Sequence, residues 1–235
     1  MGRSLRIYML EGGAIGPKTV EMGNWSGKAI YSPRAFMKNI LVRTEFDSPG
    51  IYFLRSDSDS IDYSESVYIG ETEYLRSRLK QHIAERDFES AICFLSKDEL
   101  LTKGHVKYLE SRLISLAYQA NNSHIENITN PQLSRLSEAD ISDMEYFIDQ
   151  IRLILPVVGL NTLVEAAPRA SGAAVEVNPS DMYKVKSKII NATMVEIDGA
   201  FVVIAGSEAS FTTSKSMSAG WRKIRKKLLD AKILI

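Results

Sequence analysis

The sequence is poor in cysteine, and this scarcity limits the disulfide and metal sites that the chain can carry. Cys93 is the only cysteine among 235 residues, so neither an intramolecular disulfide nor a cysteine-based zinc site can form. Histidines are also few, and His82, His105 and His124 lack zinc-finger spacing. A reducing, cytoplasmic location is therefore the expectation.

The chain also lacks a net charge and a long apolar run. Its 29 Lys and Arg residues balance 29 Asp and Glu residues. Because many nucleic-acid-binding proteins are strongly basic, global charge gives no support to a nucleic-acid partner, and any such surface would have to be local. No apolar run approaches the roughly 20 residues that span a bilayer, so no membrane partner is expected. The N-terminus has no long apolar signal segment before Glu11.

What remains is the ordinary balance of a globular protein. Hydrophobic residues make up 45% and charged residues 25%, and the length allows one large domain or two small ones. The stretch 164–180 is small, polar and patternless, which is typical of a linker. We therefore expect a β-rich N-terminal extension at 1–49, a main domain at 50–163, this linker and a small C-terminal module at 181–235.

The main domain contains strand patterns followed by helix patterns. Aromatic and β-branched residues predict strands at 50–54, 66–70 and 91–96. Apolar residues at helical spacing predict helices at 73–85, 102–120 and 137–155. Thr72 is the expected N-cap of the first helix, and Ser137 with Asp140 approximates a capping box for the last. Pro156 should end that last helix. These elements predict an α/β fold with a small mixed or antiparallel sheet flanked by helices.

Shorter signals mark the two ends of the chain. Arg6–Leu10 is strand-like, and Ser32-Pro33 fits the start of a helix that continues to about Leu41. Beyond the linker, two strand-like segments are predicted, with a hairpin turn at Asp198-Gly199. A basic helix at about 216–231 closes the chain.

Two predicted helices carry polar residues beside their apolar stripes. Arg78 and His82 are four residues apart, so both lie on one side of their helix. Taken singly, such residues are more often a solvated arginine and a half-buried histidine than parts of a site. Glu110 borders the apolar stripe of the next helix, where a carboxylate is costly unless it is paired or binds a metal. An ion pair with Arg78 is its simplest structural explanation.

Tyr52 and Tyr68 are central in neighbouring predicted strands. Tyrosine is common in strands and usually packs there. It can act as a base only if its pKa, ordinarily roughly 10, is lowered by nearby cations or a metal. Arg78 could supply part of that field.

The order of these residues resembles a known family. Gly50-Ile51-Tyr52, Tyr68-Ile69-Gly70, Arg78, His82 and Glu110 match the GIY-YIG nuclease pattern. Each three-residue motif is weak alone, but the ordered combination on strand, strand, helix and helix is specific. The superfamily includes intron homing endonucleases, some restriction enzymes and the 3′-incising part of bacterial nucleotide-excision repair.

The resemblance implies metal-dependent cleavage of a phosphodiester bond in nucleic acid, with DNA favoured over RNA, in restriction, defence or repair. Glu110 would hold one divalent cation, Mg²⁺ or Mn²⁺, which would polarise the scissile phosphate. Arg78 would neutralise charge on that phosphate. The family's further asparagine would be Asn127, with Asn130 as the alternative.

The resemblance also implies roles for the remaining side chains. Tyr52 or Tyr68 would orient or deprotonate the attacking water, and His82 would hydrogen-bond a tyrosine or carry the proton. One position departs from the family, because Glu71 stands where some relatives carry a lysine. This departure argues against lysine-assisted activation of the tyrosine.

The likeness reaches beyond the main domain. Segments before and after it look like a bacterial group of GIY-YIG proteins of unassigned role. Residues 193–235 resemble the start of a small uncharacterised module found behind such domains. By that comparison the chain ends near the midpoint of the module, so a truncated module is expected.

Two basic segments are candidates for nucleic-acid binding. Residues 76–80 and 221–227 are most often solvated helix faces. Beside a nuclease domain they supply candidate phosphate contacts: Arg76, Lys80, Arg222, Lys223 and Arg225. Two alternatives to an enzyme keep the same fold, a non-catalytic nucleic-acid-binding protein and a protein-interaction module.

Overall fold

The chain forms two compact units, 1–165 and 166–235, and each is described by itself. The computed structural model describes residues 2–11, 13–58, 63–129, 131–165, 182–186, 190–197, 200–210 and 219–230. The boundary between Glu165 and Ala166 falls inside the segment predicted as a linker. The rest of that predicted linker, except for its first two residues, lies outside the described residues.

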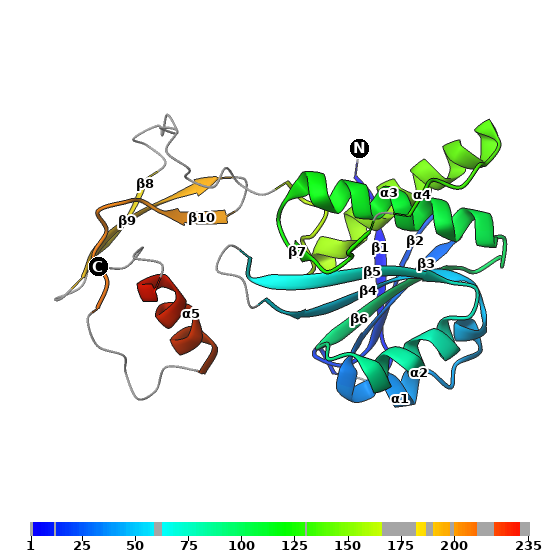
Figure 1. Ribbon diagram of the computed structural model, residues 1–235, viewed down its shortest axis with the longest axis horizontal. Helices are drawn as coiled ribbons and strands as arrows, with labels where there is room; N and C mark the ends of the chain where they lie inside the picture. Colours follow the sequence, from blue (N-terminus) through cyan, green and yellow to red (C-terminus); the bar gives the residue numbers. More distant parts are fainter. Residues whose placement is uncertain are drawn as a thin grey trace. The chain divides into compact units, whose positions relative to one another are not determined.

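A seven-stranded sheet runs through the first unit (Figure 1). Its order is β1-β2-β3-β6-β4-β5-β7, and all neighbours are antiparallel except β5 and β7. The strands are β1 (Leu5–Met9), β2 (Lys18–Met22), β3 (Gly27–Pro33), β4 (Gly50–Asp57), β5 (Glu65–Thr72), β6 (Ser90–Ser96) and β7 (His124–Ile125). This mixed sheet confirms the predicted α/β class. The N-terminal segment contributes three strands to the same sheet.

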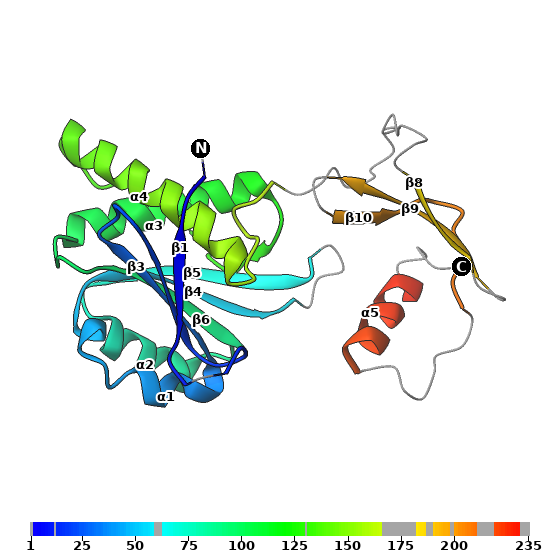
Figure 2. The same ribbon diagram turned by 180° about the vertical axis from the view of Figure 1, so that it is seen from behind.

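Helices cover both faces of this sheet (Figures 1 and 2). One face packs against α1 (Met37–Ile40) and α2 (Leu75–Glu85), and the other against α3 (Lys103–Ala120) and α4 (Glu138–Val157). Two short 3₁₀ helices, Arg34–Phe36 and Thr44–Asp47, connect β3, α1 and β4.

Strand β4 is buried on both sides and separates two hydrophobic cores. Side chains alternate across a strand, so Ile51 and Phe53 pack toward α3 and α4. Tyr52 and Leu54 point the other way, toward α2. The two motif strands β4 and β5 pair directly, with Tyr52 opposite Gly70 and Leu54 opposite Tyr68. Both motif tyrosines therefore lie on the α2 face.

Three predicted helix boundaries are wrong by a few residues. Ser32 and Pro33 belong to strand β3, because that strand pairs with β6 through Pro33, and the helical turns start at Arg34. Helix α2 starts at Leu75, and the Thr72 hydroxyl accepts from the main chain of Tyr74 in the preceding turn instead of capping the helix. Helix α4 includes Pro156 and ends one residue later, so a proline in the last turn is tolerated.

The second unit contains a three-stranded antiparallel sheet and one helix. Its strands are β8 (Met182–Lys186), β9 (Asn191–Ile197) and β10 (Ala200–Val203), in the order β10-β9-β8. Asp198 and Gly199, the predicted hairpin turn, lie outside the described residues. Helix α5 (Ala219–Asp230) agrees with the predicted basic helix, except at the ends of the predicted range, which lie outside the described residues.

Candidate active site

The two motif glycines mark places where other groups approach the strands closely. A Cβ on Gly70 would lie 2.3 Å from the Tyr52 hydroxyl oxygen, so only glycine lets that tyrosine cross over β5. A Cβ on Gly50 would lie 2.5 Å from the main-chain oxygen of Phe94 and 2.7 Å from a Leu75 methyl group. The glycines therefore fix how tightly β4, β5, β6 and α2 pack around Tyr52.

Tyr52 is the centre of a buried hydrogen-bond network. Its hydroxyl lies 2.8 Å from His82 Nε2, and Arg78 Nε donates to the hydroxyl oxygen at 3.2 Å. A guanidinium can only donate, so the hydroxyl accepts from Arg78 and its own proton is available to His82. Tyr52 is fully buried and His82 nearly so. Helix α2 brings Arg78 and His82 together as the four-residue spacing predicts.

The surroundings of this network set its protonation. Burial raises the pKa of Tyr52 far above its ordinary value, and the hydrogen bond from Arg78 only partly opposes that rise. Burial, followed by the charges of Arg78 and Arg86, lowers the pKa of His82 to about 4. At neutral pH the network therefore consists of a neutral phenol, a neutral imidazole and a guanidinium cation. His82 Nδ1 is buried and has no hydrogen-bond partner among the described residues.

Tyr68 stands beside this network and is partly exposed. Its ring lies 6.2 Å from the ring of Tyr52 and 5.5 Å from that of His82, between centroids. The guanidinium of Arg86 covers it at 4.0 Å and is also paired with Glu126 at 3.2 Å. Sequence reasoning missed Arg86, which directly follows the last residue of α2 in an extended conformation, where helical spacing does not predict its direction.

Glu110 of α3 interacts electrostatically with the same group of residues. Burial, and then the neighbouring carboxylate of Glu71, raises the pKa of Glu110 to about 7. Burial likewise raises the pKa of Glu71, with Lys107 and Lys103 opposing it. Within the described residues Arg78 donates to Tyr52 and Gln81, and it acts on Glu110 only through its charge. The simple ion pair between Arg78 and Glu110 is therefore not what the structure contains.

Asn127 supports strand β5 at its outer edge. Its side-chain oxygen accepts from Ile69 N–H at 3.0 Å, and its side-chain nitrogen donates to the Ile69 oxygen at 2.7 Å. Since β7 pairs with β5 only near Ser66 and Val67, the amide of Asn127 continues that pairing toward the motif. Asn127 thus holds the main chain between Tyr68 and Gly70. The alternative, Asn130, lies outside the described residues.

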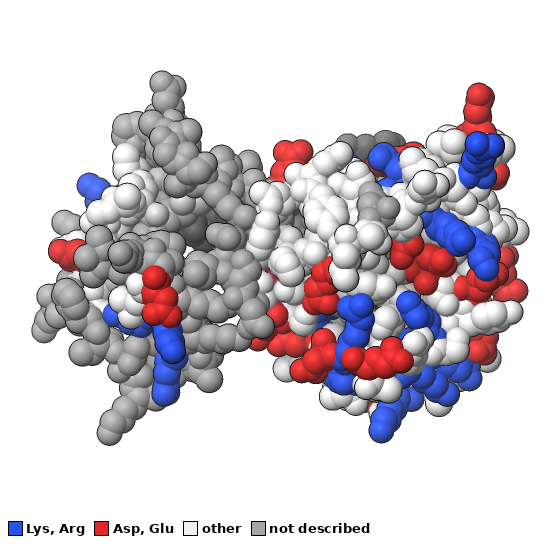
Figure 3. Space-filling view, in the orientation of Figure 1, with Lys and Arg blue, Asp and Glu red and all other residues white. Residues whose placement is uncertain are grey.

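Arg76 and Lys80 lie on a different side of α2 from Arg78. At roughly 100° per residue, each is about 160° around the helix from Arg78. Arg76 pairs with Asp47 at 2.8 Å and donates a hydrogen bond to the main-chain oxygen of Arg43. These two interactions stabilise the fold. The face in Figure 3 shows acidic and basic side chains interspersed on the first unit.

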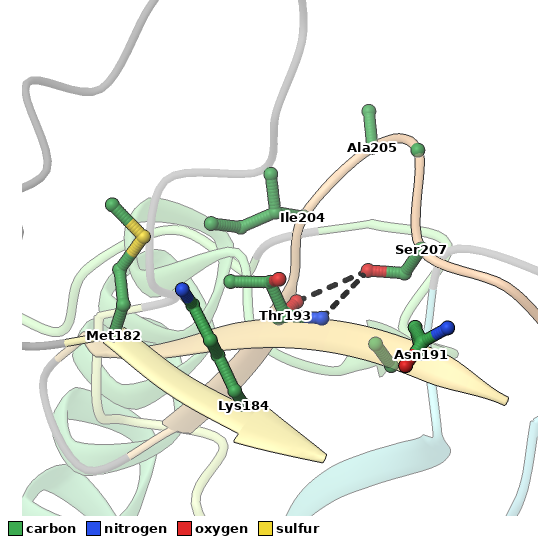
Figure 4. Close-up of a pocket in the computed structure, with 9 residues that line it drawn as sticks. Met182, Lys184, Asn191, Thr193, Ile204, Ala205 and Ser207 are labelled. Atoms are coloured by element: carbon green, nitrogen blue, oxygen red, sulfur yellow. Dashed lines mark hydrogen bonds between the residues drawn. The ribbon is translucent and has the colours of Figure 1, made fainter. Parts of the chain in front are cut away.

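The second unit offers different chemistry. Helix α5 carries Arg222, Lys223 and Arg225, of which Arg225 donates to the main-chain oxygen of Ser210. The Lys223 side chain lies outside the described part of the unit. A cavity of about 650 Å³ lies beside β8 and β9 (Figure 4), and Ser207 beside it is bonded to the main chain of Thr193. Among the described residues that line this cavity, Lys184 is the only one with an ionisable side chain.

The residues of the first unit can be tested against a divalent cation. Mg²⁺ is usually bound by one or two carboxylates together with water and substrate phosphates. Glu110 with Glu71 beside it supplies that kind of oxygen donor, and burial raises the pKa values of both carboxyl groups more than the neighbouring cations lower them. The described residues contain no group of three or more His, Cys, Asp or Glu side chains that could hold a metal. The residues therefore fit a cation shared with substrate, not one held in a protein cage.

Comparisons with protein-family models, with curated proteins and with solved structures found no match for this chain. Among the described helices, none combines the length and the apolar character needed to cross a membrane.

Proposed function

We propose that this chain is a metal-dependent endonuclease of the GIY-YIG type that hydrolyses phosphodiester bonds in nucleic acid, with DNA favoured over RNA. The observation that carries the proposal is the Arg78–Tyr52–His82 network, with Tyr68 beside it and Glu110 within electrostatic reach. These residues come from two strands and two helices. A guanidinium and phenol hydroxyls can donate to a charged phosphate, and a carboxylate can bind a cation shared with it. Restriction, defence or repair are the proposed settings.

The two tyrosines take different parts in the proposed reaction. Tyr52 is fully buried and holds its proton, so it positions Arg78 and His82 and does not meet water itself. Tyr68 is partly exposed and can touch the substrate or the attacking water. Arg78 remains charged at any working pH and stabilises the phosphate as negative charge accumulates on it. His82 is neutral at pH 7, so its Nε2 can accept the hydrogen bond of the Tyr52 hydroxyl and orient that group.

Glu110 is the proposed ligand for the cation, and Glu71 is close enough to act on the same ion through its charge. When bound, Mg²⁺ or Mn²⁺ polarises the scissile phosphate and stabilises the leaving oxygen. A cation here would also relieve the repulsion between the two carboxylates, because it favours their ionised forms.

A second candidate is a non-catalytic nucleic-acid-binding or protein-interaction protein with the same fold. Its supporting observation is the complete burial of Tyr52, which gives the network a structural use. The interspersed surface charge in Figure 3 is compatible with it as well.

Incubation with defined substrates separates these candidates. The purified chain should be mixed with supercoiled plasmid, linear duplex, single-stranded DNA and RNA, with Mg²⁺, Mn²⁺ or a chelator. Cleavage that requires the metal and is lost in Glu110→Ala supports the nuclease. Binding to any of these substrates without cleavage supports the nucleic-acid-binding alternative, and the absence of both leaves the protein-interaction alternative.

A further inference from the structure

Strand β1 exposes apolar side chains at one end of the seven-stranded sheet. Ile7, Tyr8 and Met9 are 41%, 64% and 40% exposed, although they lie in the middle of a regular ladder with β2. Among the described residues, β2 is the only strand that pairs with β1 (Figure 2). Open edge strands with apolar side chains tend to pair with another strand.

The hydrogen bonds of the β1–β2 hairpin determine which main-chain groups face outward. Leu10 N–H donates to the Pro17 oxygen at 2.9 Å, so this pair is a hydrogen-bonded position of the ladder. Hydrogen-bonded and non-hydrogen-bonded pairs alternate in antiparallel strands. Arg6 and Tyr8 therefore direct their N–H and C=O groups toward β2. Leu5, Ile7 and Met9 direct theirs toward the open edge.

We propose that β1 is a homodimer interface, in which β1 of a second copy pairs antiparallel across a two-fold axis at Ile7. In this register Ile7 faces Ile7 of the second copy, and Leu5 faces Met9. Each of these is an outward-facing residue, so three hydrogen-bonded pairs form, with about six hydrogen bonds in all. The two sheets join into one, and the interface is self-complementary, as a two-fold dimer requires.

Charges select this register over its neighbours. Centred on Ile7, Arg6 faces Tyr8, which permits a cation–π contact. A shift that centres the pair on Arg6 places two arginines opposite each other, which is destabilising. A shift that centres it on Tyr8 leaves Leu5 opposite Glu11 and removes the contact between Arg6 and Tyr8. The Ile7-centred register also pairs every residue of β1.

Apolar residues on α4 continue the same surface. Arg3, just before β1, donates to Gln150 of α4 at 2.9 Å, so this part of α4 lies beside the strand. Tyr146 and Leu153, one turn on either side of Gln150, are 50% and 43% exposed. A two-fold axis perpendicular to the joined sheet keeps equivalent faces on one side. The two α4 helices therefore lie on the same face of the joined sheet, with their apolar stripes near the dimer axis.

Sedimentation equilibrium of the full chain, from about 1 to about 100 µM, tests the interface. The wild type is expected to dimerise, and Ile7→Lys should weaken the dimer at least about tenfold, because it places two like charges opposite each other. Ile15→Lys is the matched control, since Ile15 is 85% exposed and lies outside β1, and it should leave the dimer unchanged. A monomer over the whole range, or a dimer that is equally stable in Ile7→Lys, overturns the proposal.

Two further measurements test the register. Tyr8→Glu should keep the dimer, because it places an acid opposite Arg6, whereas Tyr8→Lys should weaken it by placing a like charge there. A short bifunctional thiol cross-linker should link Ile7→Cys into a dimer readily and Met9→Cys slowly, because Met9 faces Leu5 and not itself. Native Cys93 is buried and does not interfere. Cross-linking of Met9→Cys as fast as Ile7→Cys, or a Tyr8→Lys dimer as stable as the Tyr8→Glu dimer, would overturn this register.

Discussion

Glu110 is the residue whose titration connects stability most directly to the proposed chemistry. Its acid form is favoured because burial and Glu71 raise its pKa from 4.5 to about 7. Between these two values the folded state holds a proton that the unfolded state releases, so stability falls as pH rises through this window. Below about 4.5 both states are protonated and the contribution is fully present.

We therefore predict that Glu110→Gln is more stable than wild type above about pH 7 and equally stable near about pH 4, because glutamine cannot acquire the buried charge. Thermal melting of both proteins across this range in chelator-treated buffer measures the difference. The same variant should lose metal-dependent cleavage. A melting-temperature difference that does not change with pH would show that Glu110 ionises freely.

Arg78 gives a second test at the residue scale. Arg78→Ala should reduce single-turnover cleavage by roughly 10²-fold or more, the loss expected when one preorganised donor is removed, with a much smaller loss of substrate affinity. Arg78→Lys should restore activity only in part, because an ammonium lacks the planar fork that reaches Tyr52. Lys80→Ala, on the opposite side of α2, is the control for the rate: as a candidate phosphate contact it should lower only the affinity. A large drop in melting temperature with an unchanged rate per folded molecule would assign Arg78 to the fold alone.

At the scale of elements, the pairing of β4 with β5 is what brings the two tyrosines onto one face. Gly70 is central to this pairing, since its missing Cβ leaves room for the Tyr52 hydroxyl. Gly70→Ala should therefore destabilise the first unit by about 1–3 kcal/mol, the usual cost of overpacking, and displace Tyr52 from Arg78 and His82.

Chemical denaturation measures the stability of this variant, and cleavage measures the displacement. Gly23→Ala is the control, because a Cβ there meets nothing within 4 Å. Equal stability of the Gly70 and Gly23 variants, with unchanged activity, would mean that the sheet can yield at Gly70 without moving the site.

The sequence predicted some of these elements well and others poorly, for physical reasons. Strands β4, β5 and β6 are buried on both faces, so continuous runs of aromatic and β-branched residues reveal them. Strands β2 and β3 were not predicted individually. The pairing of β3 with β6, which is distant in sequence, cannot be read from local periodicity. The two-residue strand β7 is too short to leave a pattern.

The candidate site was predictable only in part for the same reason. The spacing of Arg78 and His82 on one helix fixes their shared side, so local periodicity suffices. The proximity of Glu71 to Glu110 depends on how α3 packs beside β5, and no spacing within one element encodes that. The contact between the Arg86 guanidinium and the Tyr68 ring likewise depends on how α2 packs against the sheet.

At the scale of the whole molecule, the chain separates into two units, so the first unit can be produced and tested by itself. All the residues of the proposed site belong to residues 1–165, and so do both hydrophobic cores. Leu160, Thr162 and Leu163 are buried at the end of this unit, so a fragment must extend past them.

We predict that the fragment 1–165 folds and retains the activity of the full chain, because few contacts should cross a linker between separate cores. Limited proteolysis of the full chain should cut first within 164–180, and the fragment should melt cooperatively near the temperature of the first unit in the full chain. A fragment ending at residue 158, which removes the three buried residues, is the control and should be markedly less stable.

An insoluble or unfolded 1–165 fragment would mean that the second unit completes the core. A folded fragment with normal cleavage but weaker nucleic-acid binding would instead assign a binding role to the second unit, where Arg222 and Arg225 lie on α5.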